Sequence, residues 1–331
     1  MKLCFIGNRG HNGYVLDGLK LLDDIEVVGI TRSKNPDETK YLEEVVSDLK
    51  HSPSIYDDFE KMLEECQPDI VSVCGPLEDH AKHCIACIKR DIHVISEKTI
   101  ALTINELNEI KETYQRHPVK LIAMMGLRFS SEFYTAKKLI LKNKIGSIRL
   151  LNSQKSYRLG TRAEHFKQRN SSGGTIPWVG SHAIDLVYWL SGQEFKSVSA
   201  IHTTKENKSC KEMEMTALCQ FSMTEDVFAS VTMDYLRPQN ANTHGDDRIR
   251  IMGTDGALEA RDGKLFLINS EQNGESEIQL EHPPQMFCDF VASIKGENDQ
   301  PVINTMDTFK VTEASLIARD AADEHIIKYI D

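Results

Sequence analysis

The stretch CFIGNRGHNGYVLDGLKLL, residues Cys4–Leu22, decides the fold. A short apolar run leads into glycines at positions 7, 10 and 13 and then into a helical pattern. Phosphate-binding turns have this order because glycine adopts φ angles that other residues avoid and a helix N-terminus carries partial positive charge. Gly10 and Gly13 match the last two glycines of G-x-G-x-x-G, and one additional residue separates them from Gly7. The turn therefore indicates a dinucleotide-binding loop or, alternatively, an ordinary strand-to-helix connection.

The first 125 residues continue this alternation of strand and helix. Apolar, β-branched runs with little alternation are typical of parallel strands that are buried on both faces. The stretch TINELNEIKETYQRH starts with Thr103 and Glu106, which form a capping-box pair and predict a helix. The predicted strands are Lys2–Ile6, Ile25–Ile30, Asp69–Cys74, His93–Ser96 and Val119–Met125. We therefore predict an α/β fold whose first domain, residues 1–125, has a doubly wound parallel sheet.

The second half has longer extended segments and tight turns. FSMTEDVFASVTMDY is typical of a hairpin, and GTDGALEARDGKLFLI contains two Asp-Gly turn signals. Helices are predicted at Ser131–Asn143 and from about Asn304 onwards. The predicted strands are Ser147–Tyr157, Ser197–Thr204, Glu214–Met223, Val227–Tyr235, Arg248–Ile251 and Lys264–Asn269. These patterns predict a second α/β domain, residues 126–331, with a large and mainly antiparallel sheet. The final helices of this domain pack either within it or back on the first domain.

Composition excludes several classes of protein. The chain has 331 residues and a formal net charge of −11, which argues against nucleic acid or an acidic membrane as a partner. Its apolar runs are far shorter than the roughly 20 residues of a membrane-spanning helix, and its first residues do not resemble a signal peptide. The eight cysteines lie mostly in apolar runs, as free thiols do in a reducing compartment. We therefore expect a cytoplasmic protein.

The end of the second strand bears on cofactor choice. NAD sites usually carry a carboxylate there, which binds the ribose hydroxyls. Here IEVVGI is followed by Thr31, Arg32 and Ser33, with no carboxylate at the tip. A guanidinium and two hydroxyl groups donate hydrogen bonds that suit a 2′-phosphate. The pattern favours NADP(H), with NAD(H) still possible and with Arg32 as a plain solvated residue the alternative.

The stretch HVISEKTIALT places Glu97 and Lys98 directly after a buried strand. Ligands of open α/β sheets bind at the carboxyl ends of the strands. A lysine at that edge is suited to act as a base with a lowered pKa or as a fixed cation that polarises a substrate oxygen. The alternative interpretation is an ion pair between Lys98 and Glu97.

Several motifs together resemble the Gfo/Idh/MocA oxidoreductases, and the resemblance spans nearly the whole chain. The motifs are VSVCGPLEDHAKHCIACIKRDIHVISEKT (71–99), GLRFSSEF (126–133), GGTIPWVGSHAIDLVYWLSG (173–192) and GTDGALEA (253–260). The resemblance implies a Rossmann domain followed by an α/β domain whose open sheet often mediates homodimers or homotetramers. It also implies a dehydrogenase or reductase that uses NAD(P)(H) and acts on CH–OH groups of a sugar, a cyclitol or a related polyhydroxy compound.

The resemblance also assigns residues. Lys98 matches the active-site lysine of the family, and His182 matches the histidine that exchanges a proton with the reacting hydroxyl or carbonyl. Asp185 follows one helical turn later, on the same face as His182. Independently, an imidazole that titrates near neutrality is suited to be a general base, although His182 as a plain helix residue is the alternative.

The predicted binding residues fall into two sets. Gly7–Gly13 are expected at the pyrophosphate, Thr31–Ser33 at the adenosine ribose, and Tyr157 and Arg158 on a strand that enters the expected cleft. The predicted cofactor-binding residues are Gly7, Asn8, Arg9, Gly10, His11, Asn12, Gly13, Thr31, Arg32, Ser33, Gly75, Pro76, His80, Glu97, Lys98 and Arg128. The predicted substrate-binding residues are Tyr157, Arg158, Trp178, His182 and Asp185.

Two positions depart from the family pattern. Thr99 stands where the family usually has proline, and Trp178 stands where many members have aspartate. An indole cannot accept a proton, but it donates one hydrogen bond and stacks on a ring. Trp178 therefore lines a sugar or cyclitol face or belongs to the core. It also favours the competing interpretation, a non-catalytic sensor that binds the dinucleotide.

The segment EDHAKHCIACIK raises the possibility of zinc, because it contains His80, His83, Cys84 and Cys87. All four lie on one predicted helix, and no second pair of ligands follows at a spacing that would complete a tetrahedron. We therefore predict no metal site. The expected partner is a small polyhydroxy substrate, with no nucleic acid and no membrane.

Overall fold

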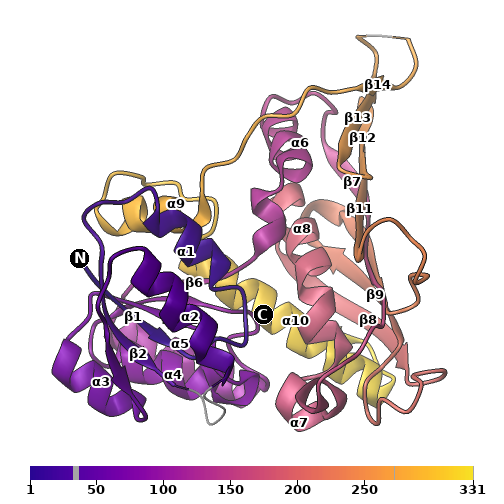
Figure 1. Ribbon diagram of the computed structural model, residues 1–331. Helices are drawn as coiled ribbons and strands as arrows, with labels where there is room; N and C mark the ends of the chain where they lie inside the picture. Colours follow the sequence, from indigo (N-terminus) through magenta and orange to yellow (C-terminus); the bar gives the residue numbers. More distant parts are fainter. Residues whose placement is uncertain (33–36, 272, 331) are drawn as a thin grey trace. The chain divides into compact units, whose positions relative to one another are not determined.

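The computed structural model describes residues 1–32, 37–271 and 273–330. The chain forms two compact units, Met1–Met124 with Pro284–Phe309, and Met125–Pro283 with Lys310–Asp331. Helix α10 (Thr305–Glu324) begins in the first unit and continues into the second. The units are described separately below (Figure 1).

The first unit contains a six-stranded parallel sheet in the order β3-β2-β1-β4-β5-β6, which confirms the predicted Rossmann sheet. Its strands are β1 (Lys2–Ile6), β2 (Glu26–Thr31), β3 (Ser54–Tyr56), β4 (Ile70–Val73), β5 (His93–Ser96) and β6 (Leu121–Ala123). Its helices are α1 (Gly13–Leu19), α2 (Asp37–Asp48), α3 (Phe59–Cys66), α4 (His80–Ile88), α5 (Ile104–Arg116) and α9 (Met286–Ile294). The predicted capping box of Thr103 and Glu106 starts α5.

The second unit contains a nine-stranded sheet in the order β14-β13-β12-β11-β7-β10-β9-β8-β15. The strands are β7 (Ile148–Tyr157), β8 (Phe195–Thr203), β9 (Thr216–Met223), β10 (Phe228–Asp234), β11 (Gly245–Gly253), β12 (Gly256–Arg261), β13 (Lys264–Asn269), β14 (Ser276–Glu277) and β15 (Lys328–Tyr329). Strands β7 and β10 pair in parallel, whereas the other described pairs are antiparallel. The predicted hairpin is β9–β10, and the sheet is mainly antiparallel as predicted.

Helices α6 (Ser131–Leu141) and α8 (Ser181–Ser191) pack on one face of this sheet (Figure 1). Leu151, Val231 and Ile251 point to that face and are fully buried. Because side chains alternate along a strand, their neighbours lie on the opposite face. Leu150 and Phe228 oppose each other there and are 42% and 53% exposed. One face of the sheet is thus core, and the other is open.

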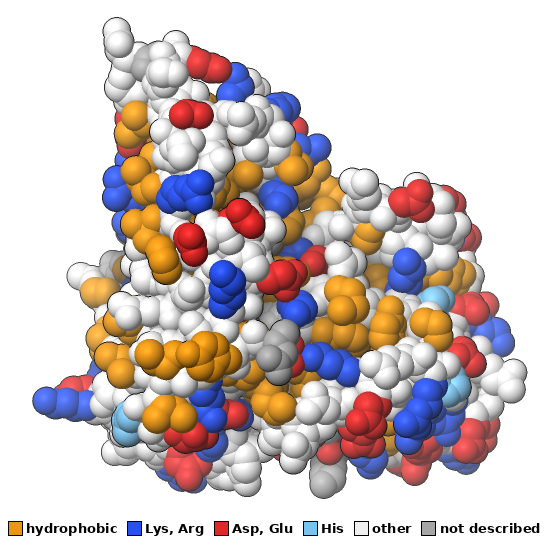
Figure 2. All heavy atoms as spheres, turned by 180° about the vertical axis from the view of Figure 1, so that it is seen from behind, with side chains coloured by type: hydrophobic (Ala, Val, Ile, Leu, Met, Phe, Trp, Pro, Cys, Tyr) orange, Lys and Arg blue, Asp and Glu red, His pale blue; other side chains and the backbone are white. Residues whose placement is uncertain are grey.

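The distribution of charged side chains on the surface and the state of the cysteines bear on the expectations from composition. On the face shown in Figure 2, basic and acidic side chains are interspersed, and hydrophobic side chains form small groups between them. All eight cysteines are free thiols, and seven of them are buried. In the described residues, no helix has the length and apolar character needed to cross a bilayer.

Candidate functional site

The glycine loop connects β1 to α1 and lies against the end of β4. Gly7 has a φ of +73°, and a Cβ there would lie 2.7 Å from Gly75 Cα, so only glycine fits. The Arg9 backbone N donates to Cys74 O at 2.6 Å. Two of the predicted loops, after β1 and after β4, are therefore brought together at the carboxyl edge of the sheet.

Asn12 fixes the shape of this loop from inside. Its side chain is buried, and Nδ2 donates to Gly7 O at 3.1 Å and to Asn8 Oδ1 at 2.9 Å. Its Oδ1 accepts a hydrogen bond from Ser72 Oγ at 2.8 Å. The amide is therefore used by the protein itself, which gives Asn12 a positioning role in the loop.

Glu97 holds the other side of the loop. It is 1% exposed, and its Oε2 accepts hydrogen bonds from the His11 backbone N at 2.9 Å and from His11 Nδ1 at 2.7 Å. Burial raises the pKa of Glu97, but the hydrogen bonds and charge of His11 and the charge of Lys98 outweigh it, so that the pKa lies below its usual range. The second oxygen, Oε1, is buried and has no hydrogen-bond partner within the described part of the chain.

His80 ties this edge of the sheet together. It is fully buried, with Nδ1 3.0 Å from Thr99 O and Nε2 3.0 Å from Gly75 O. Burial lowers the pKa of His80, and a neutral imidazole donates through only one of the two nitrogens. Next to Thr99, Lys98 is 2% exposed, and the peptide bond between the two residues is cis. His80 therefore connects the loop after β4 to the Glu97–Lys98 turn.

A hollow of about 380 Å³ lies at this edge and collects much of the predicted cofactor set. Several residues that line this hollow were not predicted from the sequence, because β3 was not recognised and the position of the loop after β3 was therefore unknown. His83 is one of them; its Nδ1 is buried without a hydrogen-bond partner among the described residues, and its ring packs edge-on against Phe59 at 4.6 Å. The lining consists of Ile6, Gly7, Arg9, Thr31, Arg32, Asp57, Asp58, Phe59, Gly75, Pro76, Glu78, Asp79, Lys82 and His83.

Arg32 lines the same hollow but is already engaged by Glu43 of α2. Arg32 Nε and Nη2 donate to Glu43 Oε1 and Oε2, both at 2.9 Å. The hydrogen bonds from Arg32 lower the pKa of Glu43, so the carboxylate stays ionised. This pair uses one edge of the guanidinium, and Nη1 is not part of it. Ser33, the last of the predicted ribose-binding residues, lies outside the described residues.

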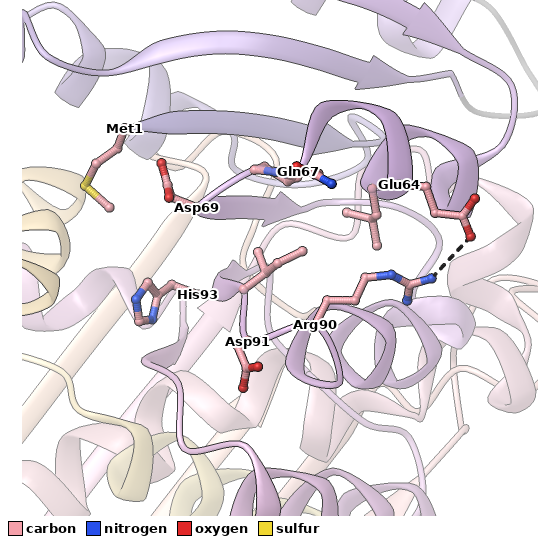
Figure 3. A pocket seen from close by; sticks show the side chains of 10 residues that line it. Met1, Glu64, Gln67, Asp69, Arg90, Asp91 and His93 are labelled. Atoms are coloured by element: carbon pink, nitrogen blue, oxygen red, sulfur yellow. Dashed lines mark ion pairs between the residues drawn. The ribbon is translucent and has the colours of Figure 1, made fainter.

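A larger hollow of about 660 Å³ lies at the opposite edge of the same sheet, at the amino ends of β4 and β5 (Figure 3). Its wall combines acidic groups with Arg90, which pairs with Glu60 at 2.5 Å and with Glu64 at 3.8 Å. Ligands of open α/β sheets bind at the carboxyl ends of the strands. This hollow is therefore not the candidate cofactor site.

In the second unit, His182 lies at the start of α8 and is 8% exposed. A π-helical turn (Ile176–Gly180) precedes α8 and carries Trp178. The indole packs against Phe166 with ring centroids 5.1 Å apart. π-Helical turns occur frequently at functional sites. Trp178 is only partly buried and borders the core of this unit, so both predicted roles of its ring stay open.

Arg128 and Asp185, predicted for cofactor and substrate, bind each other. Arg128 Nη2 donates to Asp185 Oδ1 at 2.6 Å, and Nε lies 3.0 Å from both carboxylate oxygens. The side chains are 0% and 1% exposed, and Trp189 lies 5.4 Å from the guanidinium carbon. This pair fixes α8 to the turn Gly126–Phe129. Direct contact of either residue with a ligand stays a prediction.

Tyr157 and Arg158 lie at the end of β7. The Tyr157 ring stacks on His244 at 4.9 Å, and the Lys155 ammonium lies 4.8 Å from the same ring. The Arg158 backbone N donates to His244 O at 3.0 Å. Across the described ranges, no group of three or more His, Cys, Asp or Glu side chains is arranged to hold a metal ion.

Both units match one family of proteins. Residues 5–125 match the oxidoreductase family with the NAD-binding Rossmann fold, and residues 133–259 match the GFO/IDH/MocA C-terminal domain. A solved structure of a putative oxidoreductase from Thermotoga maritima is 39% identical, covers 100% of both chains and superposes with a TM-score of 0.94. The two matches together account for most of the chain.

Curated relatives are more distant. The scyllo-inositol 2-dehydrogenase (NADP(+)) of Bacillus subtilis is 27% identical over 60% of this chain and 54% of its own length. The D-glucoside 3-dehydrogenase of Escherichia coli is 23% identical over 63% of this chain and 60% of its own. Across such relatives, the match spans 37% to 77% of their length.

Proposed function

The chain belongs to the Gfo/Idh/MocA family of oxidoreductases, and we propose that it interconverts a hydroxyl and a carbonyl on a sugar, cyclitol or related polyhydroxy compound with NAD(P)(H). One observation carries the proposal. Glu97 connects the glycine loop to the turn that bears Lys98, so the expected pyrophosphate and nicotinamide contacts belong to one rigid edge of the sheet. Two relatives are named as dehydrogenases of an inositol and of a glucoside, and these names support a polyhydroxy compound as the substrate class.

The dinucleotide fits the first unit. The absence of side chains at Gly7 and Gly75 lets a pyrophosphate approach the backbone of the two loops closely, and the buried Glu97 Oε1 is an acceptor for a carboxamide N–H. When bound, the dinucleotide accepts or supplies the hydride.

The protein supplies the remaining groups. Lys98 orients the reacting oxygen and polarises it as a fixed cation. His182 exchanges the proton with that oxygen, because an imidazole works as acid and base near neutral pH. Asp185 and Arg128 hold the helix that carries His182. A buried ion pair with no exposed surface suits this positioning role.

NADP(H) is the favoured cofactor. Glu43 takes the Nε edge of Arg32 and orients the guanidinium, which leaves Nη1 for a 2′-phosphate. The inositol relative carries NADP(+) in its name, which supports this choice. NAD(H) is the alternative, because Glu43 also neutralises part of the Arg32 charge.

The location and the assembly state belong to the same proposal. We infer a cytoplasmic homodimer or homotetramer that pairs through the open face of the nine-stranded sheet. The adjacent exposed side chains of Leu150 and Phe228 support that face as the interface.

A second candidate function is a sensor that binds the dinucleotide without turnover, which Trp178 favours because an indole exchanges no proton. Assays of hydride transfer at 340 nm with sugars and polyols, each with NADP(H) and NAD(H), separate the two functions. Turnover of a polyhydroxy compound supports the enzyme, and cofactor binding without any turnover supports the sensor.

A further inference from the structure

Two arginines follow β7 in the second unit and have few partners. Arg162 Nη2 donates to Arg158 O at 2.9 Å, and its guanidinium carbon lies 4.7 Å from the ring of Tyr235. The Nε–H groups of Arg158 and Arg162 are buried and donate to no acceptor within the described part of the chain. In the same residues, neither guanidinium forms an ion pair with a carboxylate. Guanidinium groups in such surroundings usually bind an anion, because removing their hydration is costly.

A third cationic side chain, Lys155, lies near these two arginines at the end of β7. Lys155 is 3% exposed, and its ammonium lies over Tyr157, whose other neighbour is the ring of His244. Burial lowers the pKa of His244, and the charges of Arg162, Arg158 and Lys155 lower it further. Three cations therefore act on one imidazole at the end of β7. We call Lys155, Arg158 and Arg162 the cationic cluster.

The acidic groups around the cationic cluster do not balance it. Asp247 Oδ2 accepts a hydrogen bond from Lys155 Nζ at 2.7 Å. Burial together with the charge of Asp247 raises the pKa of Glu132, which favours the neutral form of Glu132. A second carboxylate, Glu214, acts on Tyr235 as Arg162 does, but Arg169 is paired with it. Two paired carboxylates thus lie near three cations, and the cluster keeps an excess of positive charge.

The cluster adjoins the elements that carry Trp178 and His182. A Cβ on Gly180, next to the start of α8, would collide with Met233 Sδ, whereas Arg162 lies over Tyr235. Met233 belongs to β10, Tyr235 follows directly after its last residue, and both are buried at positions roughly 7 Å apart. The segment of Arg162 also supplies Phe166, which packs on Trp178. The cluster and the start of α8 therefore lie side by side in the second unit.

From this geometry we infer that the cationic cluster binds an anionic group, a carboxylate or a phosphate, on the polyhydroxy substrate. The donors match these ligands, because guanidinium groups bind planar carboxylates and phosphates through two N–H groups and the ammonium adds a point charge. The inference rests on the proposed function and narrows it from polyhydroxy compounds in general to sugar acids or sugar phosphates.

Binding to matched ligands tests the inference. Isothermal titration of the full chain with saturating NADPH compares glucose with glucuronate and glucose 6-phosphate, and myo-inositol with an inositol phosphate. At least one anionic ligand should bind 10-fold or more tightly than its neutral counterpart, and the ranking of the uronate and the phosphates identifies the anion. Arg162→Gln and Arg158→Gln should each weaken anionic binding by about 10- to 100-fold and affect the neutral counterpart less.

Two variants control for folding and for net charge. Lys205→Gln removes one charge from the exposed loop after β8 and should leave the preference for anionic ligands unchanged. Arg162→Lys keeps the charge and should restore part of the lost affinity. Equal affinity for charged and neutral ligands, or an equal loss for both kinds in Arg162→Gln, overturns the inference. Hydride transfer is measured separately. Turnover of neutral sugars alone refutes only the inference that the cluster binds an anionic group of the substrate. Anion binding without any turnover refutes only the proposal that the chain is an enzyme.

Discussion

The carboxylate of Glu97 accepts two hydrogen bonds from His11, at 2.9 Å from the backbone N and at 2.7 Å from ring Nδ1. The two residues are 86 positions apart in the sequence. This contact connects the loop after β1 to the turn after β5, which are the two segments that the proposed function assigns to the cofactor.

Replacement of Glu97 should weaken both the fold and cofactor binding. Glu97→Gln keeps the shape of the side chain but removes the negative charge of the carboxylate that accepts hydrogen bonds from His11. The Kd for NADPH should therefore rise by about 10-fold. The folded-state pKa of Glu97 is depressed, so its stabilisation is present at neutral pH and is lost as pH falls through that pKa. Urea unfolding should therefore give a larger difference between wild type and Glu97→Gln at pH 7 than at pH 3.5. Equal differences at both pH values contradict this role.

Arg32 should decide between the two cofactors. Arg32→Gln removes the group that faces the 2′-phosphate, so NADPH should bind about 10- to 100-fold more weakly while the affinity for NADH changes by less than threefold. Lys20→Gln, on the exposed side of the first unit, is the matched control. Fluorescence titration with each cofactor measures the ratio. A wild-type protein that binds NADH more tightly than NADPH refutes the preference for NADP(H).

The buried pair of Arg128 and Asp185 should contribute strongly to the stability of the second unit. Arg128→Met leaves an uncompensated buried carboxylate and should cost about 3–5 kcal/mol of unfolding free energy. The double variant Arg128→Met with Asp185→Leu removes both charges and should cost less than the single one. Urea denaturation measures both. A double variant whose loss of unfolding free energy relative to wild type equals the sum of the losses in Arg128→Met and Asp185→Leu would show that the two residues act independently.

His182 should affect chemistry more than binding. His182→Asn keeps a polar side chain at the start of α8 but cannot take up the proton, so kcat should fall by about 100-fold or more. KM for the substrate should change by less than fivefold. The pH profile of the wild-type rate should also lose one titration step in His182→Asn. A pH profile that persists in the variant assigns the proton to another residue.

Much of the fold could be predicted because its signals are local. The strands Lys2–Ile6 and His93–Ser96 were predicted with the bounds that the structure shows, since continuous apolar runs next to glycine or polar turns are distinctive. Strand β3 was missed because it has three residues and two of them are exposed, which leaves no apolar pattern. Because β3 was not predicted, the residues that follow it, Asp57, Asp58 and Phe59, were not included in the predicted site.

The site was predictable in its residue types and less so in its contacts. The glycine loop and Glu97 were placed correctly at the carboxyl edge of the sheet, because motifs mark strand ends. The pairing of Arg32 with Glu43 and of Arg128 with Asp185 joins residues 11 and 57 positions apart. Such partners depend on how helices pack, which no local pattern encodes. Arg158 of the cationic cluster was among the predicted substrate-binding residues, whereas Lys155 and Arg162 were not, because their contacts with Tyr157 and Tyr235 depend on packing.

The central claim, that this chain is an enzyme and that Lys98 serves its chemistry, is tested most directly by one comparison. Hydride transfer at 340 nm is measured for wild type and Lys98→Met on the polyhydroxy compound that the wild type turns over fastest, and NADPH binding is measured on the same samples. The account predicts turnover by the wild type and a loss of about 100-fold or more in Lys98→Met, with NADPH affinity within a fewfold. Cofactor binding without turnover of any compound, unchanged by Lys98→Met, would contradict it.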